Sequence, residues 1–147
     1  MRRVKNNSTP KAAKPDFQGG AIVPFVTHPV SAGFASPAQD FLEDRVDLDK
    51  ELIDNELTTF YIRVAGTSMT GAGIDNGDIL VVDRSIEPAD GRIAICLIDG
   101  EFTVKRLKLG DGCLYLMPEN PKYKPLLVTE ESQFSVWGIV TYVVKKL

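Results

Sequence analysis

The sequence predicts a mainly β domain. After Thr58, almost every segment is a short apolar run bounded by turn residues, which is the pattern of strands joined by tight turns. The chain has 147 residues and is 44% hydrophobic, so it can bury one core. We expect seven strands, at residues 59–65, 78–83, 92–98, 102–109, 113–117, 125–128 and 134–145.

Turn residues separate these strands. Asp99-Gly100 is a strong hairpin signal, because Asp and Gly tolerate the positive φ angles that a two-residue turn requires. Gly110-Asp111-Gly112 is expected to join the next pair of strands in the same way. The order of elements in this half of the chain is therefore strand, tight turn, strand.

The part before Thr58 has a different composition. Residues 1–20 are polar and rich in Lys, Asn, Pro and Gly, which predicts a flexible segment. Residues 21–35 are expected to form an extended arm. The acidic stretch at 47–56 predicts a short helix or turn.

A helix is expected to begin at Ser36. Ser36-Pro37-Ala38-Gln39 offers a serine cap, a proline at the first helical position and a glutamine three residues after the cap. The helical period would then place Phe41, Leu42 and Val46 on the inner face.

Ser68 lies in a small-residue turn, Gly66-Thr67-Ser68-Met69, directly after a predicted strand. A serine hydroxyl is a weak nucleophile until a neighbouring base takes its proton. The single histidine, His28, lies far upstream next to a proline. A lysine can serve instead if burial makes its amine neutral, and Lys105 stands on another predicted strand.

The strand pattern leaves two interpretations of Lys105 open. Thr103, Lys105, Leu107 and Leu109 share one face of the strand, so the lysine is the only charge in a mostly apolar row. Its methylene stem can cover apolar surface while its ammonium group reaches water. Alternatively, the amine is buried and can act as a base.

The turn around Ser68 is rich in glycine, at positions 66, 71, 73 and 77, which allows tight turns with positive φ angles and close approach by another chain. Such a turn can point the backbone N–H groups of Thr67 and Ser68 at a developing oxyanion. Asp75 and Asp78 suggest a turn cap rather than a metal site, since no His or Cys stands near them.

The chain contains four distinctive segments: Gly66–Met69, Gly73–Asp83, Asp99–Leu107 and Val136–Val140. These segments resemble the self-cleaving LexA/UmuD family of serine–lysine peptidases, and the UmuD branch in particular. The resemblance spans about residues 22–146. Residues 30–37 correspond to the family's cleavage site and imply a scissile bond between Ala32 and Gly33. UmuD-like members often have cysteine before that glycine, whereas LexA-like repressors have alanine.

This resemblance implies a fold and the roles of the site residues. The fold would be a small, highly curved β-sheet of the LexA C-terminal-domain type, with an extended, flexible N-terminal arm and one short helix. Residues 1–32 would be the arm that self-cleavage removes, and residues 33–147 the β-rich peptidase and partner-binding domain. Ser68 would be the nucleophile and Lys105 the general base.

The resemblance also implies partners. A RecA filament on single-stranded DNA would stimulate self-cleavage during the SOS response. The processed protein, as a homodimer, would be the accessory subunit of an error-prone, UmuC-like translesion polymerase of the Y family. Two other readings stay open: a catalytically silent adaptor, and a phage or plasmid transcriptional regulator that acts through heterodimers. Only 32 residues precede Gly33 and they show no helical periodicity, so a complete LexA-like repressor with a helix-turn-helix is not expected.

The distribution of charge argues against a DNA-binding function for the folded part of the chain. The first 14 residues hold five basic residues and no acid, and the remainder holds 12 basic against 20 acidic residues, a formal charge of −8. An acidic body argues against sequence-specific DNA binding by the folded part, and the basic head fits a short polar tail better than a nucleic-acid contact.

No apolar run approaches the roughly 18 residues of a membrane span, and no signal-peptide core follows the basic start. We therefore expect a cytoplasmic protein, unlike the membrane-anchored signal peptidases, which also use a serine and a lysine. Cys96 and Cys113 lack metal-ligand spacing and are expected to be buried free thiols. No cofactor or metal is predicted.

The apolar final strand also has two interpretations. Phe134, Val136, Ile139, Val140 and Val143 are either core residues or part of a surface that a second copy covers.

Overall fold

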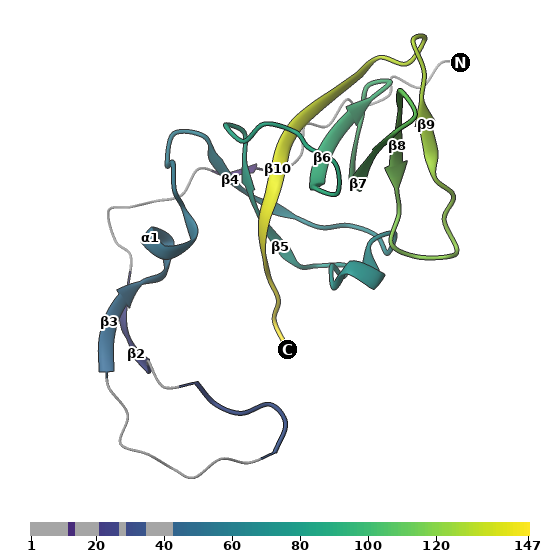
Figure 1. Ribbon diagram of the computed structural model, residues 1–147. Helices are drawn as coiled ribbons and strands as arrows, with labels where there is room; N and C mark the ends of the chain where they lie inside the picture. Colours follow the sequence, from purple (N-terminus) through teal and green to yellow (C-terminus); the bar gives the residue numbers. More distant parts are fainter. Residues whose placement is uncertain (1–11, 14–20, 27–28, 35–42) are drawn as a thin grey trace, which may run out of the picture. The chain divides into compact units, whose positions relative to one another are not determined.

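The computed structural model describes residues 12–13, 21–26, 29–34 and 43–147 (Figure 1). The chain divides into two compact units. One unit comprises residues 16–54, and the other comprises residues 1–15 together with 55–147. Each unit is described by itself.

An antiparallel sheet of eight strands, counted over the described residues, forms the larger unit. The order across the sheet is β1-β4-β5-β10-β6-β7-β8-β9. The strands are β1 (Ala12–Ala13), β4 (Thr59–Arg63), β5 (Ile79–Asp83), β6 (Ile93–Ile98), β7 (Glu101–Gly110), β8 (Cys113–Met117), β9 (Leu126–Val128) and β10 (Phe134–Val144). This confirms the mainly β class and all seven predicted strands, whereas β1 lies in a segment for which no strand was expected.

Strand β10 joins the two halves of this sheet (Figure 1). Its first part pairs with β6, and its second part pairs with β5. Ile139 pairs with strands on both sides, opposite Ala94 and Asp83. The register shifts once between Val136 and Gly138 and again between Val140 and Tyr142, and such irregularities bend and twist a strand. The resulting curvature lets the sheet fold around a core.

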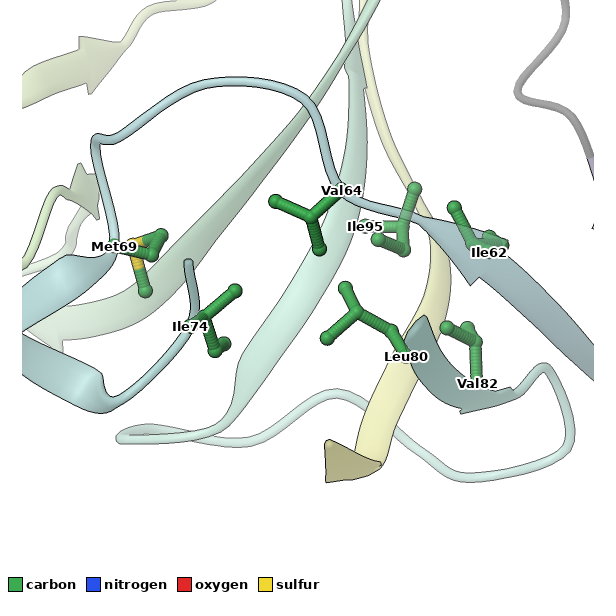
Figure 2. Packing of buried hydrophobic residues seen from close by; sticks show 7 residues of the cluster. All are labelled: Ile62, Val64, Met69, Ile74, Leu80, Val82 and Ile95. Carbon is green, nitrogen blue, oxygen red and sulfur yellow. The ribbon is translucent and has the colours of Figure 1, made fainter. Parts of the chain in front are cut away.

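Two clusters of buried side chains fill this sheet. The larger one lies mainly between β4, β5 and β6 and includes three residues from the segment between β4 and β5 (Figure 2). Its buried members are Ile62, Val64, Met69, Ile74, Leu80, Val82 and Ile95. The smaller cluster comprises Ala94, Cys96, Leu107, Leu116 and Ile139.

The predicted hairpin turns are both present. Asp99 and Gly100 have φ angles of 48° and 80°, and they join β6 to β7. Asp111 and Gly112 have φ angles of 51° and 74°, and they join β7 to β8. Two consecutive left-handed residues match the right-handed twist of the flanking strands.

The smaller unit contains a two-stranded sheet and a helix. Strand β2 (Ile22–Val26) pairs with β3 (Glu43–Asp47), and α1 (Leu48–Leu52) follows directly. The side chain of Asp47 caps α1 by accepting a hydrogen bond from the Asp49 N–H at 3.1 Å. The short helix or turn predicted at 47–56 is therefore confirmed.

The helix expected from Ser36 to Val46 is wrong over its second part. Glu43–Asp47 is a strand, in which Val46 lies opposite Val23 of β2. Pairing with an apolar strand outweighed the capping signal in the local sequence. Phe41 and Leu42 lie outside the described residues.

The two cysteines differ from each other. Cys96 is fully buried in the smaller cluster, as expected, whereas Cys113 is exposed, so the expectation was wrong for Cys113. Cys113 is the first residue of β8 and lies opposite Gly110, beside the exposed turn at the end of the sheet. No helix in the described ranges is long and apolar enough to cross a membrane.

At Gly138, β10 lies so close to the neighbouring strand β5 that a larger residue should destabilise the fold. A Cβ atom at this position would lie 2.6 Å from Cγ1 of Val82, whose side chain is fully buried and cannot move away freely. Gly138→Ala should therefore lower the free energy of unfolding by about 1–3 kcal/mol, measured by urea denaturation.

Gly110→Ala is the matched control, because a Cβ there meets nothing within 4 Å and the change should stay within about 0.5 kcal/mol. Adding Val82→Ala to Gly138→Ala should cost less than the two single changes together. Strictly additive costs would contradict the predicted collision.

Candidate active site

Ser68 lies in the turn between β4 and the 3₁₀ helix η1 (Thr70–Ala72). The next residue, Met69, and Ile74 at the end of the turn are both buried in the larger cluster (Figure 2). Thr67 on the other side is exposed, and Ser68 itself is half-buried. The turn is therefore anchored by its apolar residues while the serine stands at the surface of the core.

Lys105 on β7 contacts Ser68 directly. Its Nζ lies 2.9 Å from Ser68 Oγ, 2.8 Å from Thr103 Oγ1 and 3.0 Å from the carbonyl oxygen of Val104. The amine is thus turned towards three oxygens of the protein, and the interpretation in which it reaches for water does not describe this structure. All three of these oxygens are neutral, so no carboxylate among them holds the charged form of the lysine.

Burial lowers the pKa of Lys105 below its ordinary value of 10.5, because the charged amine loses its hydration. Cys96 pairs across the sheet with Thr103, and its thiol acts on this pKa in the opposite direction. Burial raises the pKa of that thiol to about 12, so it carries no charge near neutral pH. The amine of Lys105 is therefore easier to deprotonate than that of an ordinary lysine.

A loop after β8 holds the serine turn from the outside. The Glu119 N–H donates to the carbonyl oxygen of Ser68 at 2.8 Å, and the Gly71 N–H donates to the carbonyl oxygen of Glu119 at 2.6 Å. A Cβ at Gly71 would lie 2.5 Å from that carbonyl oxygen. Glycine is required here because another segment of the same chain approaches closely.

Side chains of the same loop add two contacts to Thr67. Asn120 Nδ2 donates to the Thr67 carbonyl oxygen at 2.9 Å, and the Tyr123 hydroxyl lies 2.9 Å from Thr67 Oγ1. Sequence reasoning missed this loop, because its Asn-Pro dipeptide predicts a turn but not what the turn contacts. It also missed Thr103, although Thr103 shares a strand face with Lys105 and could have been found by that spacing.

The predicted oxyanion donors, the N–H groups of Thr67 and Ser68, belong to this turn. In the described part of the chain, the backbone N–H donors in and around the turn are those of Gly66, Thr70, Gly71, Ala72, Gly73 and Ile74. The amides of Thr67 and Ser68 are not among these donors. Their role as an oxyanion hole stays a prediction.

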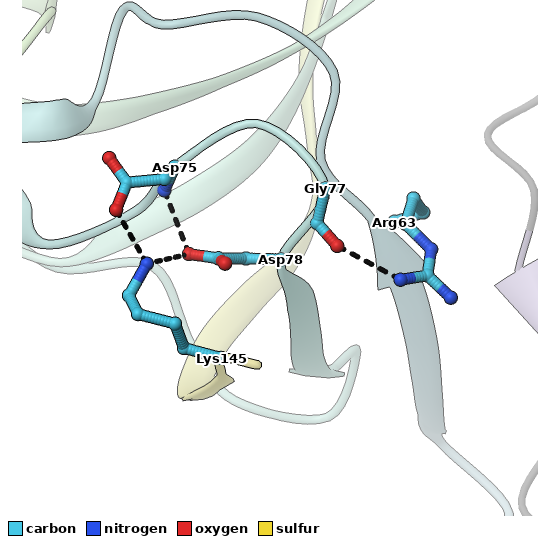
Figure 3. A network of polar contacts seen from close by, with 5 residues as sticks. All are labelled: Arg63, Asp75, Gly77, Asp78 and Lys145. Carbon is cyan, nitrogen blue, oxygen red and sulfur yellow. Dashed lines mark hydrogen bonds and ion pairs between the residues drawn. The ribbon is translucent and has the colours of Figure 1, made fainter. Parts of the chain in front are cut away.

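Asp75 and Asp78 close the turn that leads into β5, which agrees with the turn cap predicted for them. The Asp75 N–H donates to Asp78 Oδ2 at 2.8 Å, and the Asp78 N–H donates to the Asp75 carbonyl oxygen at 3.1 Å. Lys145 follows β10, and its Nζ lies 2.6 Å from Asp75 Oδ2 and 2.5 Å from Asp78 Oδ2. Figure 3 draws both contacts. On the other side, Arg63 Nη1 donates to the Gly77 carbonyl oxygen at 2.9 Å (Figure 3). No group of three metal-ligating side chains occurs within the described ranges.

Ala32 and Gly33 belong to the smaller unit and lie in an exposed bend. The Ser31 hydroxyl accepts from the Gly33 N–H at 3.3 Å and donates to the carbonyl oxygen of Phe34. The side chains of Val30 and Phe34 are 90% and 96% exposed. The bond between Ala32 and Gly33 is thus accessible. His28 lies outside the described residues.

Comparisons with known proteins show the family of this chain. The family model described as "Peptidase S24-like" matches residues 24–141. The chain belongs to the peptidase S24-like family. The match covers the Ser68 turn, the Lys105 strand and the Ala32–Gly33 bond.

Three relatives illustrate the relationship. The chain is 43% identical to the protein SamA of Salmonella typhimurium, over 86% of this chain and 87% of SamA. It is 38% identical to the protein ImpA of Escherichia coli, over 92% of both chains. It is also 34% identical to the LexA repressor of Bordetella petrii, over 91% of this chain but only 59% of the repressor. Together these matches confirm the resemblance to the LexA/UmuD family.

The contacts of Lys145 predict how stability changes with pH. The hydrogen bonds from Lys145 and from the Asp75 N–H lower the pKa of Asp78 below 3.8. The Asp78 carboxylate therefore stabilises the fold above pH 3.8, and this contribution is lost as the pH falls through the pKa of Asp78 in the folded protein. The same contacts raise the pKa of Lys145 above 10.5, and its contribution is lost only as the pH rises through that higher value.

Lys145→Met should therefore reduce the melting temperature most between about pH 4 and pH 10, and the difference from wild type should shrink towards pH 2. Lys146→Met, which removes the adjacent exposed lysine, is the control and should change little. A deficit in Lys145→Met that persists undiminished at pH 2 would show that the ion pairs are not its cause.

Proposed function

We propose that this member of the peptidase S24-like family is a self-cleaving serine peptidase with Ser68 as nucleophile and Lys105 as general base. The observation that carries the proposal is the 2.9 Å contact between Ser68 Oγ and Lys105 Nζ, with the pKa of the lysine lowered by burial. A base must lie within hydrogen-bond reach of the proton that it removes, and it must be able to lose its own.

The reaction begins when Ser68 Oγ attacks the carbonyl carbon of Ala32 and passes its proton to Lys105 Nζ. The oxyanion that forms accepts hydrogen bonds from the amides of Thr67 and Ser68. When the C–N bond to Gly33 breaks, Lys105 donates the proton to the departing amine. A water molecule, deprotonated by Lys105, then hydrolyses the ester between Ser68 and Ala32 and regenerates the serine.

Thr103 and Val104 orient the amine for this cycle. Their oxygens receive two of the hydrogens of Lys105 Nζ, so the remaining position on the nitrogen is directed at Ser68 Oγ. Neither residue carries a charge that would hold the lysine protonated. The accessible bend at Ala32 and Gly33 must open into an extended form before it can enter a peptidase cleft.

Self-cleavage in this proposal divides the chain into the arm, residues 1–32, and the β-rich product, residues 33–147. A RecA filament on single-stranded DNA stimulates the cut. The product then serves as a homodimeric accessory subunit of a UmuC-like, error-prone translesion polymerase in the SOS response. Membership of the family and the resemblance to its UmuD branch support this role.

The pH dependence of self-cleavage tests the dyad. Because Lys105 must be neutral to accept a proton, the cleavage rate without any partner should rise with pH from neutral towards the lowered pKa of Lys105. The RecA filament should extend activity to neutral pH. Mass measurement should show that Gly33 is the new N-terminus, and any other residue there would rule out the proposed bond.

Ser68→Ala and Lys105→Ala should each abolish the cut, and the double variant should be no worse than either single one. A bulky residue in place of Gly33 should also block the reaction. Melting curves serve as the control, because both dyad variants should remain folded. If Lys105→Ala still cuts between Ala32 and Gly33 at a comparable rate, the mechanism is wrong.

Dimer formation is a separate prediction, and it concerns the end of β10. Ile139 is fully buried and Val140 packs on the larger cluster, so the first part of this strand is core. Its end is different, since Tyr142, Val143 and Val144 are 47%, 37% and 42% exposed. We expect a homodimer in sedimentation at micromolar concentration, weakened by Tyr142→Glu and unaffected by Lys146→Glu. A monomeric wild-type protein would contradict this prediction.

A further inference from the structure

Ser68 and Lys105 come from segments that do not pair with each other. The serine turn follows β4, and the lysine lies on β7 at the other side of β10 and β6. A catalytic hydrogen bond of 2.9 Å needs both groups placed to a fraction of an ångström, and an error of 1 Å can cost about 100-fold in rate. Some contact must therefore set the distance between the serine turn and strand β7.

The loop formed by residues 119–123 provides one half of this connection. It donates to the Ser68 carbonyl oxygen, accepts from the Gly71 N–H, and contacts Thr67 through Asn120 and Tyr123. These contacts involve both the backbone and side chains of the serine turn. Because of these contacts, a displacement of the loop would also displace the serine turn.

Arg106 provides the other half. Its Nε donates to Glu119 Oε1 at 2.5 Å, and its Nη1 donates to the Gly91 carbonyl oxygen at 2.7 Å. Gly91 is itself tied to β7, because its N–H donates to the Leu107 carbonyl oxygen at 2.8 Å. The guanidinium is thus held at two points, and Arg106 follows Lys105 directly in the sequence.

We propose that Arg106 and Glu119 are positioning residues for the Ser68–Lys105 dyad. Their ion pair holds the 119–123 loop, and through it the serine turn, at a set distance from the strand that carries the base. This inference rests on the proposed self-cleavage. It adds a role for a pair that touches neither the reacting bond nor the lysine amine.

The solvent exposure of Arg106 and Glu119 allows a positioning role to be distinguished from a contribution to stability. The side chains of Arg106 and Glu119 are 36% and 33% exposed, and ion pairs that solvent can reach contribute little to stability. Removing the pair should therefore change the melting temperature only slightly. Because Lys105 keeps its own three partners, the pH midpoint of the reaction should also stay in place.

The test compares Arg106→Ala, Glu119→Ala and the double variant with wild type, measuring the self-cleavage rate from pH 7 to pH 11. Each single variant should lower the plateau rate about 10- to 100-fold without moving the midpoint. The double variant should be no slower than the slower single variant, since the two side chains act as one unit. Glu119→Ala keeps the backbone contacts of residue 119 with Ser68 and Gly71.

Two further variants sharpen this comparison. Lys108→Ala removes an exposed cation from the same face of the same strand, and it should cleave like wild type. Arg106→Lys can still reach Glu119 but loses the second contact of the guanidinium fork, so its rate should lie between those of wild type and Arg106→Ala. Wild-type rates in all pair variants, or a loss of rate that tracks a loss of folding, would overturn the proposal.

Amide hydrogen exchange tests the same inference independently of catalysis. In a Ser68→Ala background, which cannot cut itself, Arg106→Ala should speed exchange at the N–H groups of Glu119 and Gly71, and Lys108→Ala should not. Unchanged exchange at these two amides would overturn the positioning role. If wild type does not cleave at all, self-cleavage itself fails, and the exchange result still decides whether the ion pair holds the loop.

Discussion

Strand β10 is the constraint on which the rest of the structure depends, because one strand pairs with both β5 and β6. The Ser68 turn leads into β5, and the Lys105 strand is the neighbour of β6. The two residues can meet only if β10 bends enough to bring these halves together. Its two register shifts and the absence of a side chain at Gly138, where a Cβ would strike Val82, make that bend possible.

Two lysines in this sheet show how surroundings decide the chemistry of one side chain. Lys145 contacts the carboxylates of Asp75 and Asp78, which raises its pKa and favours its charged form (Figure 3). The amine of Lys105 donates its hydrogen bonds to neutral oxygens, and burial lowers its pKa. The first lysine stabilises a turn, and the second is suited to accept a proton.

The serine turn is held on three sides, by different kinds of interaction. Met69 and Ile74 pack into the larger cluster, the 119–123 loop binds the turn through hydrogen bonds, and Lys145 closes the exit of the turn into β5. Rigid support of this kind keeps a nucleophile in place before its substrate arrives. In contrast, Ala32 and Gly33 lie in an exposed bend held mainly by Ser31.

The sequence by itself determined the mainly β class, the seven strands, both hairpin turns, and Ser68 and Lys105 as candidate site residues. These follow from local rules: the two-residue period of strands, the positive φ of Asp-Gly turns, and the need of a serine for a base. Only the tertiary structure decided that Glu43–Asp47 is a strand and that Cys113 is exposed. It also decided that Thr103 contacts the amine of Lys105 and that Arg106 pairs with Glu119. The physical reason is that these features depend on contacts between segments that lie far apart in the chain. The local periodicity of a sequence carries no information about which distant segments pair, which residues they bury or what a loop contacts.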